Sequence, residues 1–549
     1  MTTRSCGEQI PFLLRDYGVD IVFGMPGVHS LEFYRSLEEA GIRHIAVRHE
    51  QGAGFMADGY ARACGKPGVA MLISGPGVTN ASTPIGHAWA DSVPILVLTA
   101  AIARENIGLN RGALHEITDQ RAVTAPLVSL SALAHTAEQV PAYLASAFAR
   151  FSSARPRPVH LSVPIDVLSE PLPEANALRS TPARPGPDPK VIEDAARLLG
   201  AASNPVIIAG GGAAKAGPYL KDLIERTGAL FVTSIAGKGC VPESHPLSLG
   251  STLQRLPTRR AIAEADCVLA IGTEIAEPDL YVTADMENAD HIDPEMLKPR
   301  LVVKGRFIRI DIDPDVAVRD YDPDLAIVGD AALAARALAG ALSDHTADLD
   351  AAAGRAAAIR DANDASMSDF ERMHDTVLHA LRAALPEDAL IFADMTQIAY
   401  TGCITFPVEQ PGCWHFSVGF GTLGVALPNA IGGQLACPGR ATCVLVGDCG
   451  LQFTLQELAT AMELELPIPI VLWDNDALGE IADFMRARQI PQIGVYPKNP
   501  DFRTLASAYD TGYTAPETLA EVTNAVREAL SAKGPTLIHV RQSRFATDA

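Results

Sequence analysis

Apolar runs and polar breaks alternate along most of the chain. Short runs rich in Val, Ile and Leu are followed by stretches whose apolar residues recur at helical spacing. This alternation is typical of doubly wound α/β domains with parallel sheets. A proline-rich stretch at 170–189 is expected to be an extended linker, and an Ala-rich, charged stretch at 350–373 is predicted to be helical. Three α/β domains are therefore expected, at 1–172, 190–342 and 376–549.

One βαβ unit at 444–481 carries the most informative chemistry. A strand is predicted to end at Gly447–Gly450, a helix to follow over 451–462, and a second strand to end just before Asn475. Because the carboxyl ends of parallel strands lie side by side, Asp448 and Asn475 are expected to meet. Their oxygens suit Mg²⁺ or Ca²⁺, and the glycines let backbone N–H groups approach a diphosphate. The alternative is an ordinary βαβ crossover with polar loop tips.

Composition narrows the class of protein. A chain of 549 residues is too long for one core, so about two to four domains are expected. The net charge of −21 disfavours nucleic acid and anionic membrane as partners. No apolar run is long enough to cross a membrane, and the N-terminus lacks the order of a signal peptide. The nine scattered cysteines fit a reducing cytoplasm and argue against structural zinc.

The motif Gly447-Asp448, followed at a distance by Asn475, resembles the thiamine-diphosphate signature of the acetolactate synthase and 2-oxo-acid decarboxylase superfamily. The resemblance implies that Asp448, Asn475 and the backbone oxygen of Ala477 hold Mg²⁺. Three α/β domains in a row are also that superfamily's layout, in the order pyrimidine-binding, central and diphosphate-binding. The resemblance therefore extends over almost the whole chain.

The diphosphate-binding segment departs from the superfamily pattern in two places. Cys449 stands where Gly or Ala is usual, and Asp474 stands where the first Asn of an Asn-Asn pair is usual. Neither is expected to supply a metal ligand through its side chain, so the metal assignment is unaffected. Further cofactor contacts are expected from Gly447, Cys449, Gly450, Leu478 and Gly479.

The segment RHEQGAGFMADGYAR, residues 48–62, closely resembles the pyrimidine-binding segment of the superfamily. The resemblance implies that Glu50 hydrogen-bonds the aminopyrimidine ring, so that a ring nitrogen can remove the C2 proton of thiamine. Taken alone, Glu50 would be an ordinary helix-start carboxylate. The nearby SGPGVTN loop, with Gly75, resembles a loop that flanks the substrate region.

Two histidines are candidates for proton transfer. His115 lies in Leu114-His115-Glu116, where acetolactate synthases usually have Phe-Gln-Glu. A decarboxylase must protonate a carbanion after CO2 leaves, and histidine can do so where glutamine cannot. His29, after a Gly-Pro-Gly turn, is the second candidate. The alternative for each is a surface or packing histidine.

Two further turns of the last segment match the superfamily. Thr396 and Gln397 correspond to the end of its Asp-Val-Gly-Gln motif and are expected to contact the diphosphate, although Ile398 replaces a frequent histidine. The turn Gly421-Thr422-Leu423-Gly424 resembles Gly-Thr-Met-Gly. Leu423 is therefore expected to wedge beneath the cofactor and bend it, unless it is simply a core leucine.

The central segment carries a weaker signal. The strand that ends in Gly210-Gly211-Gly212 resembles the domain that binds FAD in acetolactate synthases. No distinctive FAD-contact pattern is present, so FAD remains an alternative that the sequence does not favour, and a scaffold role is the better interpretation.

The expected reaction is non-oxidative decarboxylation of a 2-oxo acid to an aldehyde and CO2, dependent on thiamine diphosphate and Mg²⁺. ALGEI and GVYPKNPDF are most similar to 5-guanidino-2-oxopentanoate decarboxylases. Glu480 and Asp483 share one helical face and would suit a cationic substrate tail, unless that face is solvated. An acetolactate synthase-type carboligase and a non-catalytic cofactor-binding relative are the alternatives. The resemblance also implies a homodimer or homotetramer, with Glu50 of one chain facing Asp448 of the other.

Overall fold

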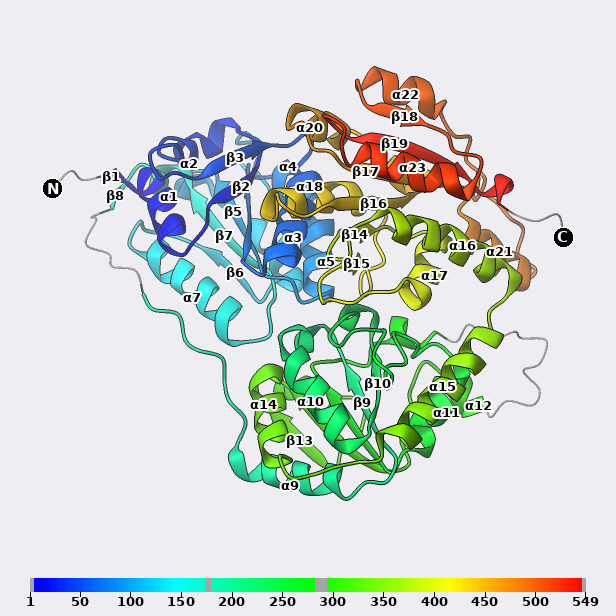
Figure 1. Cartoon of the computed structure of the whole chain (residues 1–549). Helices are drawn as coiled ribbons and strands as arrows, with labels where there is room; N and C mark the ends of the chain where they lie inside the picture. Colours follow the sequence, from blue (N-terminus) through cyan, green and yellow to red (C-terminus); the bar gives the residue numbers. More distant parts are fainter. Residues whose placement is uncertain (1–3, 173–178, 282–293, 546–549) are drawn as a thin grey trace.

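The computed structural model describes residues 4–172, 179–281 and 294–545 (Figure 1). It contains three parallel sheets, each packed between helices, and this confirms the predicted α/β class. A short antiparallel pair, β1 (Arg4–Ser5) with β8 (Pro171–Leu172), joins the two ends of the first domain. None of the described helices combines the length and apolar character that crossing a membrane requires.

The first sheet has the strand order β3-β2-β4-β5-β7-β6. Its inner strands are rich in Val, Leu and Ala and buried along their whole length, as expected for parallel strands covered on both faces. The strands are β2 (Ile21–Gly24), β3 (Arg43–Ala46), β4 (Gly68–Leu72), β5 (Ile95–Ala101), β6 (Leu130–Leu133) and β7 (Val159–Pro164). The main helices are α1 (Cys6–Asp16), α2 (Leu31–Tyr34), α3 (Glu50–Cys64), α4 (Pro76–Asn80), α5 (Ser82–Ala90), α6 (Gln120–Thr124) and α7 (Gln139–Ser153).

The central sheet has the order β10-β9-β11-β12-β13. Its elements are β9 (Pro205–Ala209), β10 (Leu230–Thr233), β11 (Cys267–Ile271), β12 (Arg306–Asp311), β13 (Leu325–Val328), α9 (Pro189–Gly200), α10 (Gly217–Thr227), α11 (Leu256–Glu264) and α14 (Ala331–Ala341). Of the predicted linker, 173–178 lie outside the described residues, and 179–188 contain no helix or strand. The stretch predicted to be one helix is divided into α15 (Leu349–Ala365) and α16 (Asp369–Ala384), because Ser368 caps the second helix.

The third sheet repeats the strand order of the first, as β15-β14-β16-β17-β19-β18. Its elements are β14 (Leu390–Ala393), β15 (Trp414–Phe416), β16 (Thr442–Gly447), β17 (Pro469–Asp474), β18 (Gly512–Thr514), β19 (Thr536–Arg541), α17 (Gln397–Thr405), α18 (Ala426–Ala436), α21 (Gly479–Ala487), α22 (Phe502–Ala508) and α23 (Leu519–Ala529). The helix predicted over 451–462 is broken into α19 (Asp448–Leu451) and α20 (Glu457–Glu463). Between them, buried Thr454 donates its hydroxyl to the Gly424 carbonyl at 2.7 Å.

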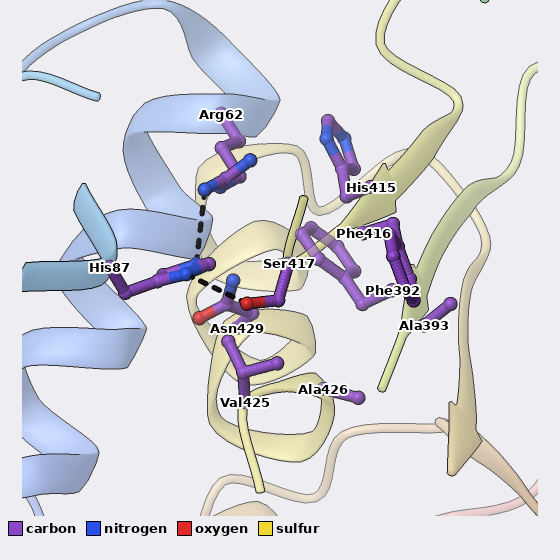
Figure 2. A pocket seen from close by; sticks show the side chains of 10 residues that line it. All are labelled: Arg62, His87, Phe392, Ala393, His415, Phe416, Ser417, Val425, Ala426 and Asn429. Atoms are coloured by element: carbon purple, nitrogen blue, oxygen red, sulfur yellow. Dashed lines mark hydrogen bonds between the residues drawn. The ribbon is translucent and has the colours of Figure 1, made fainter. Parts of the chain in front are cut away.

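The first and third domains pack against each other through α3 and α18, which lie side by side (Figure 1). A Cβ on Gly59 would collide with the backbone of Asn429, so only glycine allows this close approach. Beside the two helices, the His87 ring lies between Arg62 and Ser417, at 3.0 and 3.1 Å (Figure 2). These residues border a cavity of about 10 Å³. A cavity of this size hardly exceeds one water molecule, so the two domains pack tightly here and leave no room for a ligand.

Candidate active site

The loops after β14, β16 and β17 meet at the carboxyl edge of the third sheet. Strand β16 pairs with β17 so that Gly447 lies opposite Trp473, which places Asp448 and Asn475 at adjacent strand ends. Thr396 follows β14, and a Cβ on Gly447 would lie 3.0 Å from its Oγ1. The structure thus places the two strand ends side by side, as the βαβ pattern predicted, and the meeting of the Asp448 and Asn475 side chains stays a prediction.

Gln397 orients Asn475. The Asn475 amide Nδ2 donates to Gln397 Oε1 at 3.1 Å, and Asn475 Oδ1 accepts from the Ala477 N–H at 3.2 Å. Next to them, a Cβ on Gly479 would lie 2.4 Å from Gln397 Oε1 and 2.6 Å from Asn475 Nδ2, so a larger residue at the start of α21 would displace these two amides. The backbone N–H of Leu478 donates to the Val495 carbonyl at 2.8 Å and ties this loop to the following segment.

Asp448 is a buried carboxylate, only 2 % exposed, and no Lys, Arg or His among the described residues pairs with it. Burial raises its pKa to about 6, and the nearby Asp474 adds to the shift. A divalent cation would compensate such a carboxylate, and an acid with an amide oxygen is a hard donor set suited to Mg²⁺. The neighbouring thiol of Cys449 is half-buried, and burial raises its pKa to about 11, so it stays neutral. The residues present therefore fit a metal-held diphosphate.

The turn at Gly421 is anchored by a buried acid. Asp394 accepts the Gly424 N–H at 2.8 Å, and burial raises the pKa of Asp394 to about 6. Gly421 has φ +61°, and Leu423 is half-buried on the turn. Gly450 packs on the same acid, since a Cβ there would lie 3.3 Å from Asp394 Cγ. One carboxylate thus supports both the turn that carries Leu423 and the loop after β16.

At the carboxyl edge of the first sheet, Glu50 begins α3. The side-chain amide of Asn80 donates to Glu50 Oε2 at 2.9 Å. The buried Glu457, from the third domain, accepts the backbone N–H groups of Arg48 and His49, both at 3.1 Å. The start of α3 is therefore fixed from both domains, and the Glu50 carboxyl is half-buried rather than free on the surface.

The two candidate histidines lie against each other. His29 Nδ1 and His115 Nδ1 are 3.1 Å apart, so one ring donates to the other. Burial, with the nearby His115, lowers the pKa of His29. His115 has φ +61°, and its backbone contacts the buried Gly75, whose N–H donates to Gln120 Oε1 at 3.0 Å. The structure thus joins His29, His115 and the Gly75 loop in one cluster.

Within one chain, these residues form two separate halves of the candidate site: Glu50, His29 and His115 in the first domain, and Asp448 and Asn475 in the third. No hydrogen bond or ion pair between described residues joins Glu50, His29 or His115 to Asp448 or Asn475. Helix α4, which carries Asn80, and helix α21 lie well apart in Figure 1. Large exposed apolar side chains occur in the segments of both halves: Val28, Leu31, Leu109 and Leu114 in the first domain, and Phe420, Phe453, Ile481, Phe484, Ile490 and Ile493 in the third.

Sequence reasoning missed three residues that orient this machinery. Gln120 holds the Gly75 loop, Glu457 holds the start of α3, and Asn499 donates to Asp448 Oδ2 at 2.7 Å. Asn499 begins the NPDF run, and the resemblance at that run gave it no role. No local signal marks the other two, because each acts on residues distant in the sequence.

In the central domain, the loops at the carboxyl ends of two neighbouring strands lie against each other. The Gly212 N–H donates to the Gly272 carbonyl at 3.0 Å, so the loops after β9 and β11 are in direct contact. A hollow of about 400 Å³, bordered by Arg300 and Tyr321, lies instead at the amino ends of β12 and β13. Open α/β sheets bind ligands at their carboxyl ends, so this hollow is not a candidate site. Over the part of the chain that the structure describes, no group of three or more His, Cys, Asp or Glu side chains could hold a metal ion.

Comparison with known families agrees with this geometry. Three thiamine pyrophosphate enzyme models match in order: the N-terminal TPP binding domain over 4–123, the central domain over 192–338, and the C-terminal TPP binding domain over 394–540. The chain belongs to the thiamine pyrophosphate enzymes, whose cofactor is thiamine diphosphate, and the superfamily predicted from the sequence is confirmed.

Individual relatives are similar over nearly their full length. A protein of Pseudomonas aeruginosa named a probable 2-ketoarginine decarboxylase is 45 % identical over 98 % of this chain and 94 % of its own. The large subunit of acetolactate synthase isozyme 1 of Escherichia coli is 31 % identical over 97 % and 93 %. An acetolactate synthase large subunit of Mycobacterium tuberculosis is 32 % identical over 90 % and 81 %.

Proposed function

We propose that this chain is a thiamine diphosphate- and Mg²⁺-dependent decarboxylase that converts 5-guanidino-2-oxopentanoate, also called 2-ketoarginine, to an aldehyde and CO2. The observation that carries the proposal is the 45 % identity, over nearly the whole chain, to a probable 2-ketoarginine decarboxylase. The acetolactate synthases are more distant, at 31–32 %. The His29–His115 pair supports the same choice, since histidine can deliver the proton that an aldehyde product needs.

In this proposal, Asp448, Asn475 Oδ1 and the carbonyl of Ala477 hold the Mg²⁺ ion. The fit rests on a buried carboxylate that pairs with no Lys, Arg or His in the described part of the chain, and on an amide oriented by Gln397. The diphosphate contacts come from the loops that converge here: Thr396, Gln397, Gly421, Gly447, Cys449, Gly450, Leu478 and Gly479. Thiamine diphosphate held by these residues would supply the electron sink that decarboxylation requires.

The remaining residues move protons and shape the cleft. Glu50, held by Asn80, hydrogen-bonds the aminopyrimidine ring and promotes removal of the C2 proton. His29 and His115 deliver a proton to the carbon that loses CO2. Burial lowers the pKa of His29, which favours the neutral ring that can accept a hydrogen bond from His115. Leu423 supports the middle of the cofactor from its turn.

Glu480 is the proposed contact for the guanidinium tail. It is half-buried at the start of α21, burial raises its pKa, and no Lys, Arg or His among the described residues pairs with it. Gln397 Nε2 reaches Glu480 at 3.4 Å and Asp483 at 3.0 Å, which places both acids beside the residue that orients Asn475. Asp483 is exposed and already pairs with Arg486 at 2.5 Å. Glu480 is therefore the carboxylate that we expect to form an ion pair with a cationic substrate.

The working unit is proposed to be a homodimer or a homotetramer. In one chain Glu50 and Asp448 belong to separate halves, and exposed apolar side chains occur in the segments of both. A second copy would bring its Glu50 to the first copy's Asp448 and cover these side chains. Light scattering during size exclusion checks this, and an active monomer would refute it. The nine free cysteines and the acidic charge support a cytoplasmic location.

The test is a substrate panel with thiamine diphosphate and Mg²⁺ present. 5-Guanidino-2-oxopentanoate, 2-oxohexanoate with its uncharged side chain, and pyruvate are compared by CO2 release, with NMR identifying aldehyde or acetolactate. The guanidino substrate is expected to give the highest kcat/KM and an aldehyde, and Glu480→Gln is expected to reduce that preference. Acetolactate from pyruvate, without turnover of the guanidino acid, would favour the carboligase alternative. No turnover of any 2-oxo acid would favour a non-catalytic relative.

A further inference from the structure

A single side-chain amide connects the acidic residues at the edge of the proposed metal site. Asn499 lies between α21 and α22, and its Nδ2 donates to Asp448 Oδ2 at 2.7 Å. The same nitrogen lies 3.2 Å from Asp474 Oδ1 and 3.4 Å from Asp476 Oδ1. The amide has only two N–H bonds for three acceptors, and the shortest contact is to Asp448. Asn499 thus links the ends of β16 and β17.

The orientation of this amide is itself fixed. Gln452 Nε2 donates to Asn499 Oδ1 at 3.3 Å and to the Asp448 carbonyl at 3.0 Å, so the Asn499 nitrogen faces the carboxylates. Asp474 is also bound by His539 Nε2 at 2.6 Å. Asp474 stands where the superfamily usually has asparagine, so this chain carries an extra carboxylate close to Asp448. The N–H groups of Asn499 lie between them and reduce their repulsion.

We propose that Asn499 is a positioning residue for the metal site. By binding Oδ2 of Asp448, it fixes the carboxylate and leaves the other oxygen, Oδ1, to face the cation. Partners that orient metal ligands in this way commonly contribute about 10–100-fold to metal affinity. The inference rests on the proposed role of Asp448 and adds a residue from a segment about 50 positions further along the chain.

The alternative is that Asn499 only anchors the segment before α22. A matched control separates the two roles. Asp501, two residues later, caps α22 by accepting the Thr504 N–H at 2.7 Å, and it is exposed. Asp501→Ala therefore loosens the start of the same helix without removing the amide. Asn499→Ala removes the amide and leaves the cap.

The experiment is calorimetric titration of Mg²⁺ into metal-free protein saturated with thiamine diphosphate, for the wild type and both variants. Binding of Mn²⁺, measured by electron paramagnetic resonance, provides a second readout, and thermal unfolding without metal confirms folding. Asn499→Ala is expected to raise the Kd for Mg²⁺ about 10–100-fold, whereas Asp501→Ala changes it less than about twofold.

The outcomes are distinct. Wild-type affinity in Asn499→Ala, or equal losses in both variants, would overturn the inference. If Asn499→Ala does not fold, Gln452→Ala is tested instead; it is expected to weaken Mg²⁺ binding several-fold, because it releases the Asn499 amide, and unchanged binding would again overturn the inference. Failure of the wild type to bind Mg²⁺ would instead remove the proposed metal site itself, which is visible before any variant is compared.

Discussion

The first and third sheets share one strand order and carry opposite chemistry at their carboxyl ends. The first ends in the groups that we propose exchange protons, Glu50 and the His29–His115 pair. The third ends in groups suited to a cation and its phosphates, Asp448 and Asn475. The shared topology fixes where the loops lie, and the few residues after each strand decide what they bind.

The two halves are also supported differently. At the third sheet, glycines and hydrogen-bonded amides hold the loops of three neighbouring strands against one another. At the first sheet, single side chains act separately: Asn80 bonds Glu50, Gln120 bonds the Gly75 N–H, and Glu457 bonds the backbone before Glu50. We therefore expect substitutions in the third-sheet half to affect cofactor loading, and substitutions in the first-sheet half to affect turnover of the loaded enzyme.

The largest effect is expected from Glu50→Gln. The amide keeps the size of the carboxyl group but cannot transfer its proton, so kcat should fall about 10²–10⁴-fold. Cofactor affinity, measured by calorimetry, should stay within a few-fold of the wild type. An unchanged rate would exclude Glu50 from the mechanism. Loss of cofactor binding would contradict the expectation that substitutions in the first-sheet half affect turnover rather than cofactor loading.

For Asp448→Asn, we expect weaker cofactor loading rather than slower turnover of the loaded enzyme. Loss of a direct metal ligand should weaken Mg²⁺ binding by about 100-fold or more, above the range for a supporting residue. Asp510→Asn is the matched control, because Asp510 is exposed, takes no part in the proposed site, and asparagine tolerates its φ of +53°. Calorimetry with and without thiamine diphosphate checks both, and normal Mg²⁺ affinity in Asp448→Asn would contradict the assignment.

A smaller effect is expected from His115→Gln, which introduces the residue usual in acetolactate synthases. Aldehyde formation should fall about 10–100-fold, since glutamine cannot deliver the proton, and carboligation products should gain share. NMR of the products gives the ratio. His135→Gln, at an exposed histidine, is the control. An unchanged product ratio would indicate that the His29–His115 pair contributes to packing and not to proton transfer.

The smallest effect on activity is expected in the central domain, from Asp279→Asn. Asp279 is buried, accepts the Ile235 N–H at 2.8 Å, and burial raises its pKa to about 7. The folded protein therefore keeps a proton that the unfolded chain loses, and stability falls as pH rises from about 4 to 7. The variant lacks this penalty, so its free energy of unfolding, measured by denaturant titration, should exceed the wild type's at pH 8 by up to about 4 kcal/mol, and the gain should shrink towards pH 4. Equal differences at both pH values would contradict this.

The sequence was sufficient for the α/β class and for the adjacent ends of β16 and β17, because strand ends in parallel sheets follow directly from the apolar pattern. It was wrong about the continuous helix over 451–462, where Thr454 bonds to the Gly424 carbonyl and breaks the helix. Periodicity alone cannot detect such a tertiary bond. For the same reason, Asn499 could not be placed beside Asp448 from the sequence: 51 residues separate them, and no pattern marks the contact.

Glu457 has a consequence for how two copies would work together. Its buried carboxylate belongs to the third domain, yet it grips the backbone just before Glu50. In the proposed dimer, that Glu50 serves the cofactor bound by the other copy. The third domain of each copy would thus hold the Glu50 that acts in the other copy's cleft. The two clefts would therefore be mechanically coupled. Mixed dimers that carry Glu457→Gln in one copy should slow only the cleft containing that copy's Glu50, and single-turnover kinetics would reveal two unequal rates.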